Sequence, residues 1–166
     1  MVTKRRKATE AEVRALASGV RLRIIRLTHA TALTNKELAQ RLGRDPATTL
    51  HHVRKLVDAG FLRPEPARRG TRGAKEIPYR STGLSWRLDT GHEPDVDEAL
   101  LEAFLAEVAE AGVRNVEQWR LVAQVPSERR EEFRRRLQDL LEEFADEPID
   151  ADADRTAVYV ALYPGS

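Results

Sequence analysis

The sequence predicts a mainly α-helical α+β fold with two parts of opposite charge. Helical periodicity covers most of residues 9–60, 95–111 and 127–145, and short strand-like runs lie between or beside these segments. Residues 1–80 carry 19 Lys or Arg against 7 Asp or Glu, whereas residues 81–166 carry 9 against 20, so the overall net charge of +1 hides halves of +12 and −11. We predict a basic flexible tail over 1–8, a basic domain over 9–88 and an acidic domain over 95–166.

The composition excludes several classes of protein. The chain has no cysteine, which rules out disulfides, cysteine-ligated zinc and a thiol nucleophile. No apolar run reaches the roughly 18 residues of a membrane span, and no apolar stretch follows the basic start of the chain, as a secretory signal would require. We therefore expect a cytoplasmic protein with no cofactor, no metal and no membrane partner.

The basic half opens with two predicted helices, over residues 9–17 and 19–30. Their apolar stripe is formed by Leu16, Val20, Ile24 and Leu27. A capping box, Thr34 with Glu37, then starts a short helix that Gly43 ends. Asp45 followed by Pro46 starts a further helix, from Pro46 to Ala59, whose core face is predicted to contain Thr49, Val53, Leu56 and Gly60.

A basic hairpin follows these helices. Residues 61–63 and 77–82 are predicted strands, and the loop between them is rich in Pro, Gly and cations. Pro78 favours an edge position for the second strand, because proline has no N–H to donate. Two helices joined by a short turn and followed by such a hairpin predict a winged helix-turn-helix domain.

The acidic half predicts a dimerisation domain that contains a β-α-β portion. The helix over 95–111 has an apolar arc too wide for one covered side, which favours burial against a second subunit. Strands are predicted over 119–125 and 156–163, on either side of a helix over 127–145 and an acidic linker over 146–154. One buried stripe of that helix is predicted to contain Phe133, Leu137, Leu140, Leu141 and Phe144. Whether the two strands pair within one subunit or across a dimer stays open.

The strongest candidate site is a double-stranded DNA surface in the basic half. A major groove admits a helix whose exposed face has small, polar and cationic side chains, and a flexible basic loop suits phosphates or a minor groove. The residues from Lys4 to Lys7 could add non-specific affinity as an arm. The candidate helix residues are Ala47, Thr48, Thr49, His51, Arg54 and Lys55, and those of the loop are Arg68, Arg69, Arg72 and Lys75.

Residues 16–82 resemble the ArsR-like, or arsenic-repressor-type, winged helix-turn-helix transcription regulators of bacteria. The resemblance is carried by Ser18–Leu27, Thr34–Leu42 and Asp45–Gly60, followed by a wing. It implies a DNA-binding homodimer, usually a repressor, in which the Pro46–Ala59 helix reads DNA. Metal-sensing members use cysteines, or His, Asp and Glu ligands on the dimer helices. This chain has no cysteine and no histidine in 95–111, so it resembles a member that does not sense metal, with a C-terminal extension.

The leading hypothesis is a homodimeric, sequence-specific regulator on a pseudo-palindromic operator. An RNA-binding or architectural protein and a winged-helix protein-interaction module are the alternatives. An enzyme is disfavoured, because the sequence lacks a Gly-rich phosphate loop, a G-x-S-x-G elbow and a cluster of metal ligands. Seven of the nine aromatic residues lie in the acidic half, where they suit either a small-molecule effector pocket or, as we favour, a dimer core.

Overall fold

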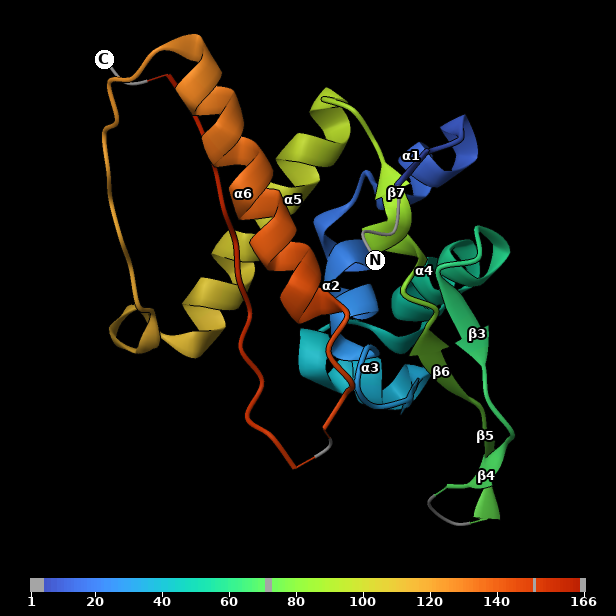
Figure 1. Ribbon diagram of the computed structural model, residues 1–166. Helices are drawn as coiled ribbons and strands as arrows, with labels where there is room; N and C mark the ends of the chain where they lie inside the picture. The colour runs from blue at the N-terminus through green and yellow to red at the C-terminus, as the bar shows by residue number, and fades with distance from the viewer. Residues whose placement is uncertain (1–4, 71–72, 151, 165–166) are drawn as a thin grey trace. The chain divides into compact units, whose positions relative to one another are not determined.

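The chain divides into two compact units, one spanning Lys4–Glu110 and the other containing Ala111–Ser166. The structure is a computed structural model that describes residues 5–70, 73–150 and 152–164 (Figure 1). Helices dominate and the strands are short, which confirms the expected α+β class. None of the helices in these described ranges is long and apolar enough to cross a membrane.

The first unit begins with four helices that lie close to their predicted bounds. They are α1 (Glu10–Leu16), α2 (Gly19–Leu27), α3 (Asn35–Leu42) and α4 (Pro46–Asp58). Both predicted start signals form. The Thr34 hydroxyl accepts from the Glu37 N–H at 3.2 Å, and an Asp45 carboxylate oxygen accepts from the Thr48 N–H at 2.9 Å. These local bonds satisfy N–H groups that have no partner inside the helix.

The start of α1 depends on a capping box that the sequence analysis missed. Thr9 caps the helix, and the Glu12 carboxylate accepts from the Thr9 N–H at 2.8 Å. The same carboxylate binds Arg6, whose Nη1 lies 2.9 Å from Oε2. The hydrogen bond from Arg6 lowers the pKa of Glu12 to about 2, against an opposing effect of burial, and bonds from Thr9 lower it further.

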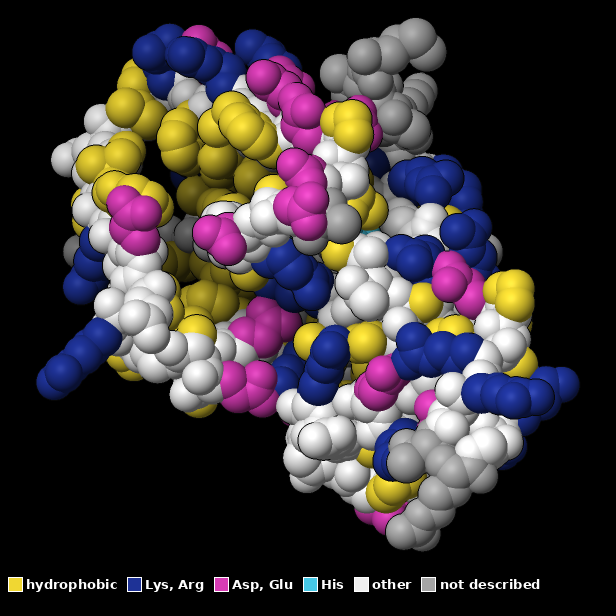
Figure 2. Space-filling view, turned by 90° about the horizontal axis from the view of Figure 1, so that it is seen from below, with side chains coloured by type: hydrophobic (Ala, Val, Ile, Leu, Met, Phe, Trp, Pro, Cys, Tyr) yellow, Lys and Arg dark blue, Asp and Glu magenta, His cyan; other side chains and the backbone are white. Residues whose placement is uncertain are grey.

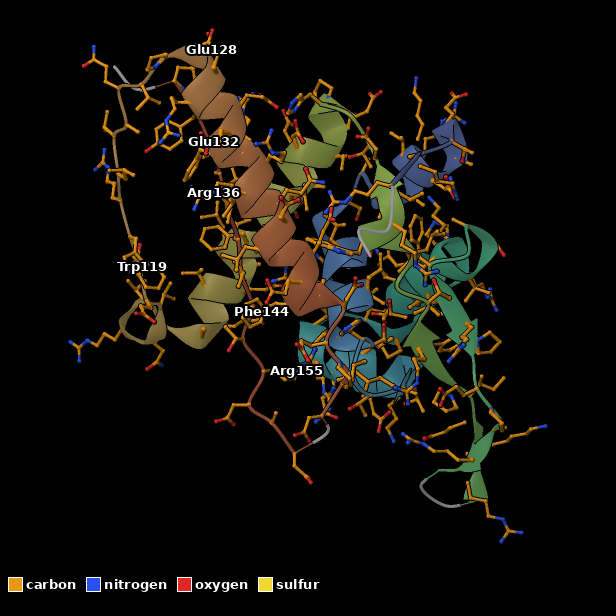
Figure 3. The ribbon with its side chains drawn as sticks, viewed as in Figure 1. Trp119, Glu128, Glu132, Arg136, Phe144 and Arg155 are labelled. Atoms are coloured by element: carbon orange, nitrogen blue, oxygen red, sulfur yellow. The ribbon has the colours of Figure 1, made fainter. Side chains whose placement is uncertain are left out.

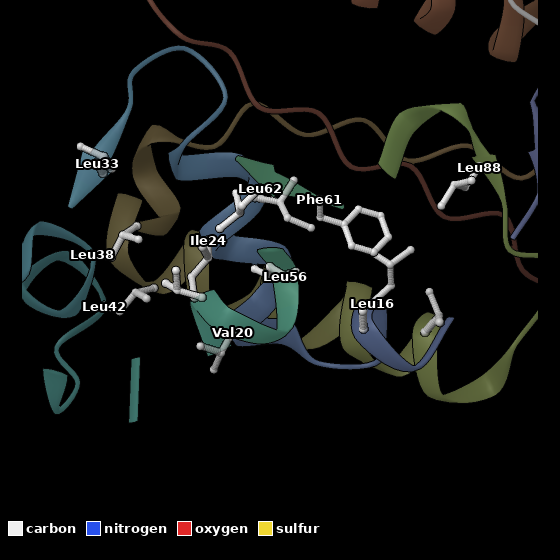
Figure 4. Close-up of a cluster of buried hydrophobic side chains, with 14 residues drawn as sticks. Leu16, Val20, Ile24, Leu33, Leu38, Leu42, Leu56, Phe61, Leu62 and Leu88 are labelled. Carbon is white, nitrogen blue, oxygen red and sulfur yellow. The ribbon is translucent and has the colours of Figure 1, made fainter. Parts of the chain in front are cut away.

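The hydrophobic core lies where α2, α3 and α4 meet the strands (Figure 4). Ile24, Leu38 and Leu56 are fully buried there, as is Phe61, which lies in the chain between α4 and the first strand of the hairpin. The predicted stripe of α2 is therefore largely confirmed, with Leu27 only partly buried. Burying side chains of this size stabilises the domain by roughly 1.5–3 kcal/mol each.

A three-stranded antiparallel sheet packs beside these helices. Its order is β2 (Leu33–Thr34), β6 (Pro78–Ser81) and β3 (Leu62–Pro64), so β6 is the central strand. The prediction that Pro78 marks an edge strand was wrong. Pro78 is the first residue of β6, where a missing N–H is tolerated, and its carbonyl still accepts from the Glu65 N–H at 2.8 Å.

Part of the predicted flexible tail is ordered. Arg6–Lys7 forms β1, which pairs in parallel with β7 (Leu88–Asp89), and the Ala8 N–H donates to the Asp89 carbonyl at 2.9 Å. The Arg5 guanidinium lies 4.4 Å from the ring centroid of Trp86, in the 3₁₀ helix Leu84–Arg87. The tail is held because these backbone and cation–π contacts add to the Arg6–Glu12 ion pair. Lys4 lies outside the described residues.

The last helix of the first unit is α5 (Pro94–Ala111). Val96, Ala99 and Ala103 form its buried stripe, and Val96 joins the main core. Ion pairs connect α5 with α2, including Arg26 Nη1 to Glu107 Oε2 at 2.7 Å. The rest of the apolar arc stays exposed, with Leu100, Leu101 and Leu105 each more than 40% accessible.

The second unit contains the 3₁₀ helix Val113–Asn115 and α6 (Ser127–Ala145). The helix was predicted with these bounds, but the strands predicted over 119–125 and 156–163 do not form. Both segments are extended chain (Figure 1), and neither is assigned to a strand among the described residues. The predicted buried stripe of α6 is also wrong for a single chain, since Phe133, Leu140 and Phe144 are exposed.

We predict that Glu12→Gln reduces the acid sensitivity of the fold. The pKa of Glu12 is lower in the folded chain than in the unfolded chain, so its charge stabilises the fold above about pH 4.5, and this contribution is lost as the pH falls toward about 2. The free energy of unfolding should therefore fall less steeply over this range in the variant than in the wild type. Urea denaturation followed by circular dichroism measures this.

Glu10→Gln is the matched control, since the Glu10 side chain is in the same turn of α1 but 78% exposed. This variant should keep the wild-type slope with pH. Equal slopes for wild type and Glu12→Gln would contradict the role given to the Arg6–Glu12 pair.

Candidate nucleic-acid interface

The position of α4 decides which of its side chains face solvent. Thr49, Val53 and Leu56 are fully buried on its inner face. Because successive residues turn by about 100°, this burial directs the opposite side of the helix outward. The exposed residues there include all the helix candidates except Thr49: Ala47, Thr48, His51, Arg54 and Lys55.

Thr49 does not belong to this exposed face. Its side chain is fully buried, and its hydroxyl donates to the Asp45 carbonyl at 2.9 Å. The prediction gave Thr49 both a core position and a DNA contact, and the structure supports only the core position. A buried threonine hydroxyl in a helix commonly donates its hydrogen bond to a backbone carbonyl in the preceding turn.

The turn that orients α4 consists of residues 43–45. Gly43 adopts a left-handed conformation with φ of 60°, which ends α3 at little cost for a residue without Cβ. The Asn35 side-chain amide then donates to the Pro46 carbonyl at 2.9 Å, joining the first turn of α3 to the first turn of α4. This bond, which sequence periodicity could not reveal, helps to fix the angle between the two helices.

The two adjacent histidines of α4 have different environments. His51 is exposed, whereas His52 is half-buried on the flank of the helix. Burial lowers the pKa of His52, and the positive charges of Arg21, His51, Arg44 and Lys55 lower it further. Both effects favour the uncharged form of the His52 ring, whereas Arg54 and Lys55 place permanent positive charge on the exposed face.

The wing extends from the sheet as a second, smaller hairpin. Its strands are β4 (Arg68–Arg69) and β5 (Lys75–Glu76), and all three predicted cations on them, Arg68, Arg69 and Lys75, are exposed. The fourth predicted cation, Arg72, lies outside the described residues. Lys and Arg side chains are numerous on the surface around α4 and the wing (Figure 2).

The exposed Arg68 side chain forms an ion pair with another residue of the same chain. Its Nη2 lies 2.6 Å from Oε1 and 2.7 Å from Oε2 of Glu37, the residue that closes the capping box of α3. Burial would raise the pKa of Glu37, but hydrogen bonds from Thr34 and the charge of Arg68 outweigh it and hold that pKa below its usual range. The sequence held no signal for this pair, because the two residues are 31 positions apart.

A shallow groove lies between the start of α3 and the wing. Its lining includes Thr34, Lys36, Lys75 and Tyr79, so two cations from distant elements meet at one surface. Sequence reasoning missed Lys36, although its place directly after the capped start of α3 was a usable signal. Among the described residues, no group of three or more His, Asp or Glu side chains could hold a metal ion.

Comparisons with known proteins identify the domain that carries this surface. Residues 16–65 match a family described as a helix-turn-helix domain, in agreement with the helix-turn-helix that the sequence predicts there. No curated protein matches the sequence.

Three solved structures show similarity at low TM-scores. A homodimeric winged helix-turn-helix DNA-binding domain of Mb0332 from Mycobacterium bovis, described as a possible ArsR-family regulator, is 24% identical, with 66% of this chain and 86% of that chain covered and a TM-score of 0.35. An apo mutant of ZitR from Lactococcus lactis is 20% identical, with coverage of 77% and 83% and a TM-score of 0.35. The adhesin competence repressor AdcR of Streptococcus pyogenes is 15% identical, with coverage of 85% and 84% and a TM-score of 0.29.

We predict that Arg68→Ala raises the pKa of Glu37. The substitution removes a positive charge and two hydrogen bonds from the carboxylate, and each of these favours its ionised form. An NMR titration of the Glu37 side-chain carboxyl measures the change.

Arg69→Ala, one position along the same strand, is the matched control and should leave the Glu37 titration unchanged. An unchanged Glu37 titration in Arg68→Ala would show that the pair does not form in solution.

Proposed function

We propose that this chain, whose residues 16–65 match a helix-turn-helix domain family, is a sequence-specific DNA-binding regulator of transcription that acts as a homodimer. We further propose that it is a repressor of the ArsR-like type and binds an imperfect palindrome. The observation that carries the proposal is α4, which presents small, polar and cationic side chains outward while its opposite face is fully buried. Catalysis is no part of the proposal.

The dimensions and chemistry of α4 suit the major groove. The helix has 13 residues and is therefore about 20 Å long, and a groove about 12 Å wide admits it. Ala47 and Thr48 in its first turn are small enough for close approach, and either can contact a thymine methyl group. His51 and Arg54 follow on the same face and can donate hydrogen bonds to base edges or phosphates.

The wing supplies phosphate contacts beside the recognition helix. Arg69 and Lys75 project from paired strands, so their backbone positions are set before binding. Contacts of this kind fix the register of a protein on the duplex and carry no sequence information themselves. We propose that Lys36 adds to this set, since it shares a groove with Lys75.

The exposed side of α5 supports the dimer. Leu100, Leu101 and Leu105 are large apolar residues left open to solvent by a helix whose other side joins the core. An apolar helix face of this kind suits a second subunit, as the sequence predicted. Two recognition helices related by a two-fold axis would meet major grooves about one helical turn apart, which suits a palindromic operator.

The buried aromatic residues weigh against single-stranded RNA as the main ligand. Stacking platforms for single strands need exposed rings, but in the basic half Phe61 is fully buried and Tyr79 is partly buried in the core. Competition between duplex DNA and single-stranded RNA of equal length separates the two functions. Preferential binding of the RNA would favour the alternative.

We predict a steep fall of DNA affinity with salt. A dimer that contacts several phosphates through the wing and α4 releases the same number of condensed counterions, so the logarithm of the affinity should fall linearly with the logarithm of the salt concentration, by about 0.9 per phosphate contacted. Gel shifts on genomic fragments selected by the protein measure the slope. A flat dependence would overturn the proposal.

We predict that His51→Ala and Arg54→Ala each weaken binding to the selected site by about 1–3 kcal/mol and weaken binding to unrelated DNA much less. The reason is that base contacts act only on the correct sequence. Arg14→Ala is the control, since Arg14 is an exposed arginine on α1, outside the proposed surface. If affinity for the selected site and for unrelated DNA fell equally, His51 and Arg54 would contact phosphates and not base edges.

A further inference from the structure

The second unit has two extended segments that flank one helix, and neither is part of a β-sheet among the described residues. Residues 119–125 precede α6, residues 156–163 follow it, and neither contains a strand. No backbone hydrogen bond joins residues 119–125 to another described residue. Unpaired extended chain of this kind offers rows of N–H and C=O groups to another strand.

The side chains of both segments have the alternation of a half-buried strand. In the first segment the residues on one side are Trp119, Leu121, Ala123 and Val125, and in the second they are Val158, Val160 and Leu162. All the large residues among these are exposed, with Trp119 at 83% and Leu121 at 77%. Both segments therefore have the sequence pattern of β-strands, but in a single chain they form no sheet among the described residues.

Most of the apolar stripe of α6 is also exposed, with Leu137 half-buried. Phe133, Leu137, Leu140 and Phe144 recur at spacings of four, three and four residues, which places them on one side of the helix. Phe144, at the end of the helix, is 69% exposed (Figure 3). A helix of 19 residues is about 28 Å long and a strand of seven or eight residues about 25 Å, so the helix can cover the length of such a sheet.

The course of the chain is that of a β-α-β unit. The two segments run in the same direction, opposite to α6 (Figure 1). A helical crossover between two parallel segments is the connection of a β-α-β unit, and a split unit of this type has another strand between its two parallel strands.

We propose that a second copy of this chain supplies that strand, so that the two copies form one intermolecular β-sheet covered by their α6 helices. One extended segment of each copy lies between the two segments of the other and runs antiparallel to both. The proposal rests on the homodimer proposed above and adds its mode of assembly. A two-fold axis makes this exchange reciprocal, because each copy inserts one strand into the sheet of the other and receives one in return.

Charge along α6 favours a second copy as the occupant. Residues 127–137 contain five Arg and three Glu, whereas residues 138–154 contain eight Asp or Glu and no Lys or Arg. Along the helix, Glu128, Glu132 and Arg136 mark the mixed first half, and only acidic charges follow (Figure 3). Antiparallel α6 helices place the basic half of one copy beside the acidic end of the other, whereas parallel helices would place the acidic ends together.

The absence of cysteine allows a clean cross-linking test in the full-length chain. One chain carries Leu121→Cys, and a second chain with a size tag carries Val158→Cys, Val160→Cys or Leu162→Cys. These three positions lie on one side of the strand and sample neighbouring registers. After mixing and mild oxidation, we expect a disulfide-linked heterodimer on a non-reducing gel for at least one pair, lost on reduction, because a disulfide needs Cα atoms within about 7 Å.

Two controls make the result specific. Arg120→Cys replaces Leu121→Cys in the same mixtures, and it should give no heterodimer, because neighbouring residues of a strand point to opposite faces. A single chain with both Leu121→Cys and the best partner substitution should cross-link between chains. A disulfide within one chain would show that the two segments pair with each other and would overturn the proposal.

Wild-type protein gives a second measurement that needs no variant. Amide hydrogen exchange in residues 119–125 should be slow at concentrations where sedimentation shows a dimer and fast after dilution to monomer. A stable dimer with fast exchange and no cross-link would overturn the sheet and leave the proposed homodimer intact. A chain that stays monomeric would overturn both, and gel shifts would still report DNA binding separately.

Discussion

The candidate function depends on how α4 is packed. Val53 and Leu56 bury its inner face against Ile24, Leu38 and Phe61, and no other orientation of the helix would cover these side chains. The outer face is thereby fixed as the surface available to a ligand. Because interiors pack densely, a rotation of α4 would open voids on one side and expose apolar groups on the other. The direction of His51 and Arg54 is a consequence of hydrophobic burial many ångströms away.

The helices could be predicted because their signals are local. Thr34 and Asp45 cap helices through bonds to residues three positions away, and Gly43 ends α3 through its own backbone conformation. Non-local pairing was less predictable. Nothing near Pro78 in the sequence shows that Leu33 and Thr34 will pair with β6, which makes it the central strand of the sheet. The same limit applies to the candidate site, where α4 was largely found but the Glu37–Arg68 pair was not.

The strands of the second unit show a different limit. Alternation in residues 156–163 predicts a strand, but a strand exists only when another strand lies beside it, and the described chain forms none there. The pattern of α6 likewise specifies a buried stripe without saying what buries it. A single chain leaves the Trp119 and Phe144 side chains exposed, although the sequence pattern predicts that they are buried. The pattern and the structure would agree if another molecule covered these side chains. This difference between the sequence pattern and the single chain is the observation from which the assembly is proposed.

The wing cations cannot contribute equally to binding a polyanion. Arg68 already contacts both oxygens of Glu37, so a phosphate must compete with that carboxylate for the guanidinium. If a phosphate replaces Glu37 as the partner of Arg68, the Glu37 carboxylate keeps its negative charge near the nucleic acid, because its hydrogen bonds from Thr34 still favour ionisation. The gain from Arg68 is thus partly offset within the protein. In the proposed complex the other exposed cations of the wing would therefore supply more of the attraction, while the Arg68–Glu37 pair joins the wing to α3.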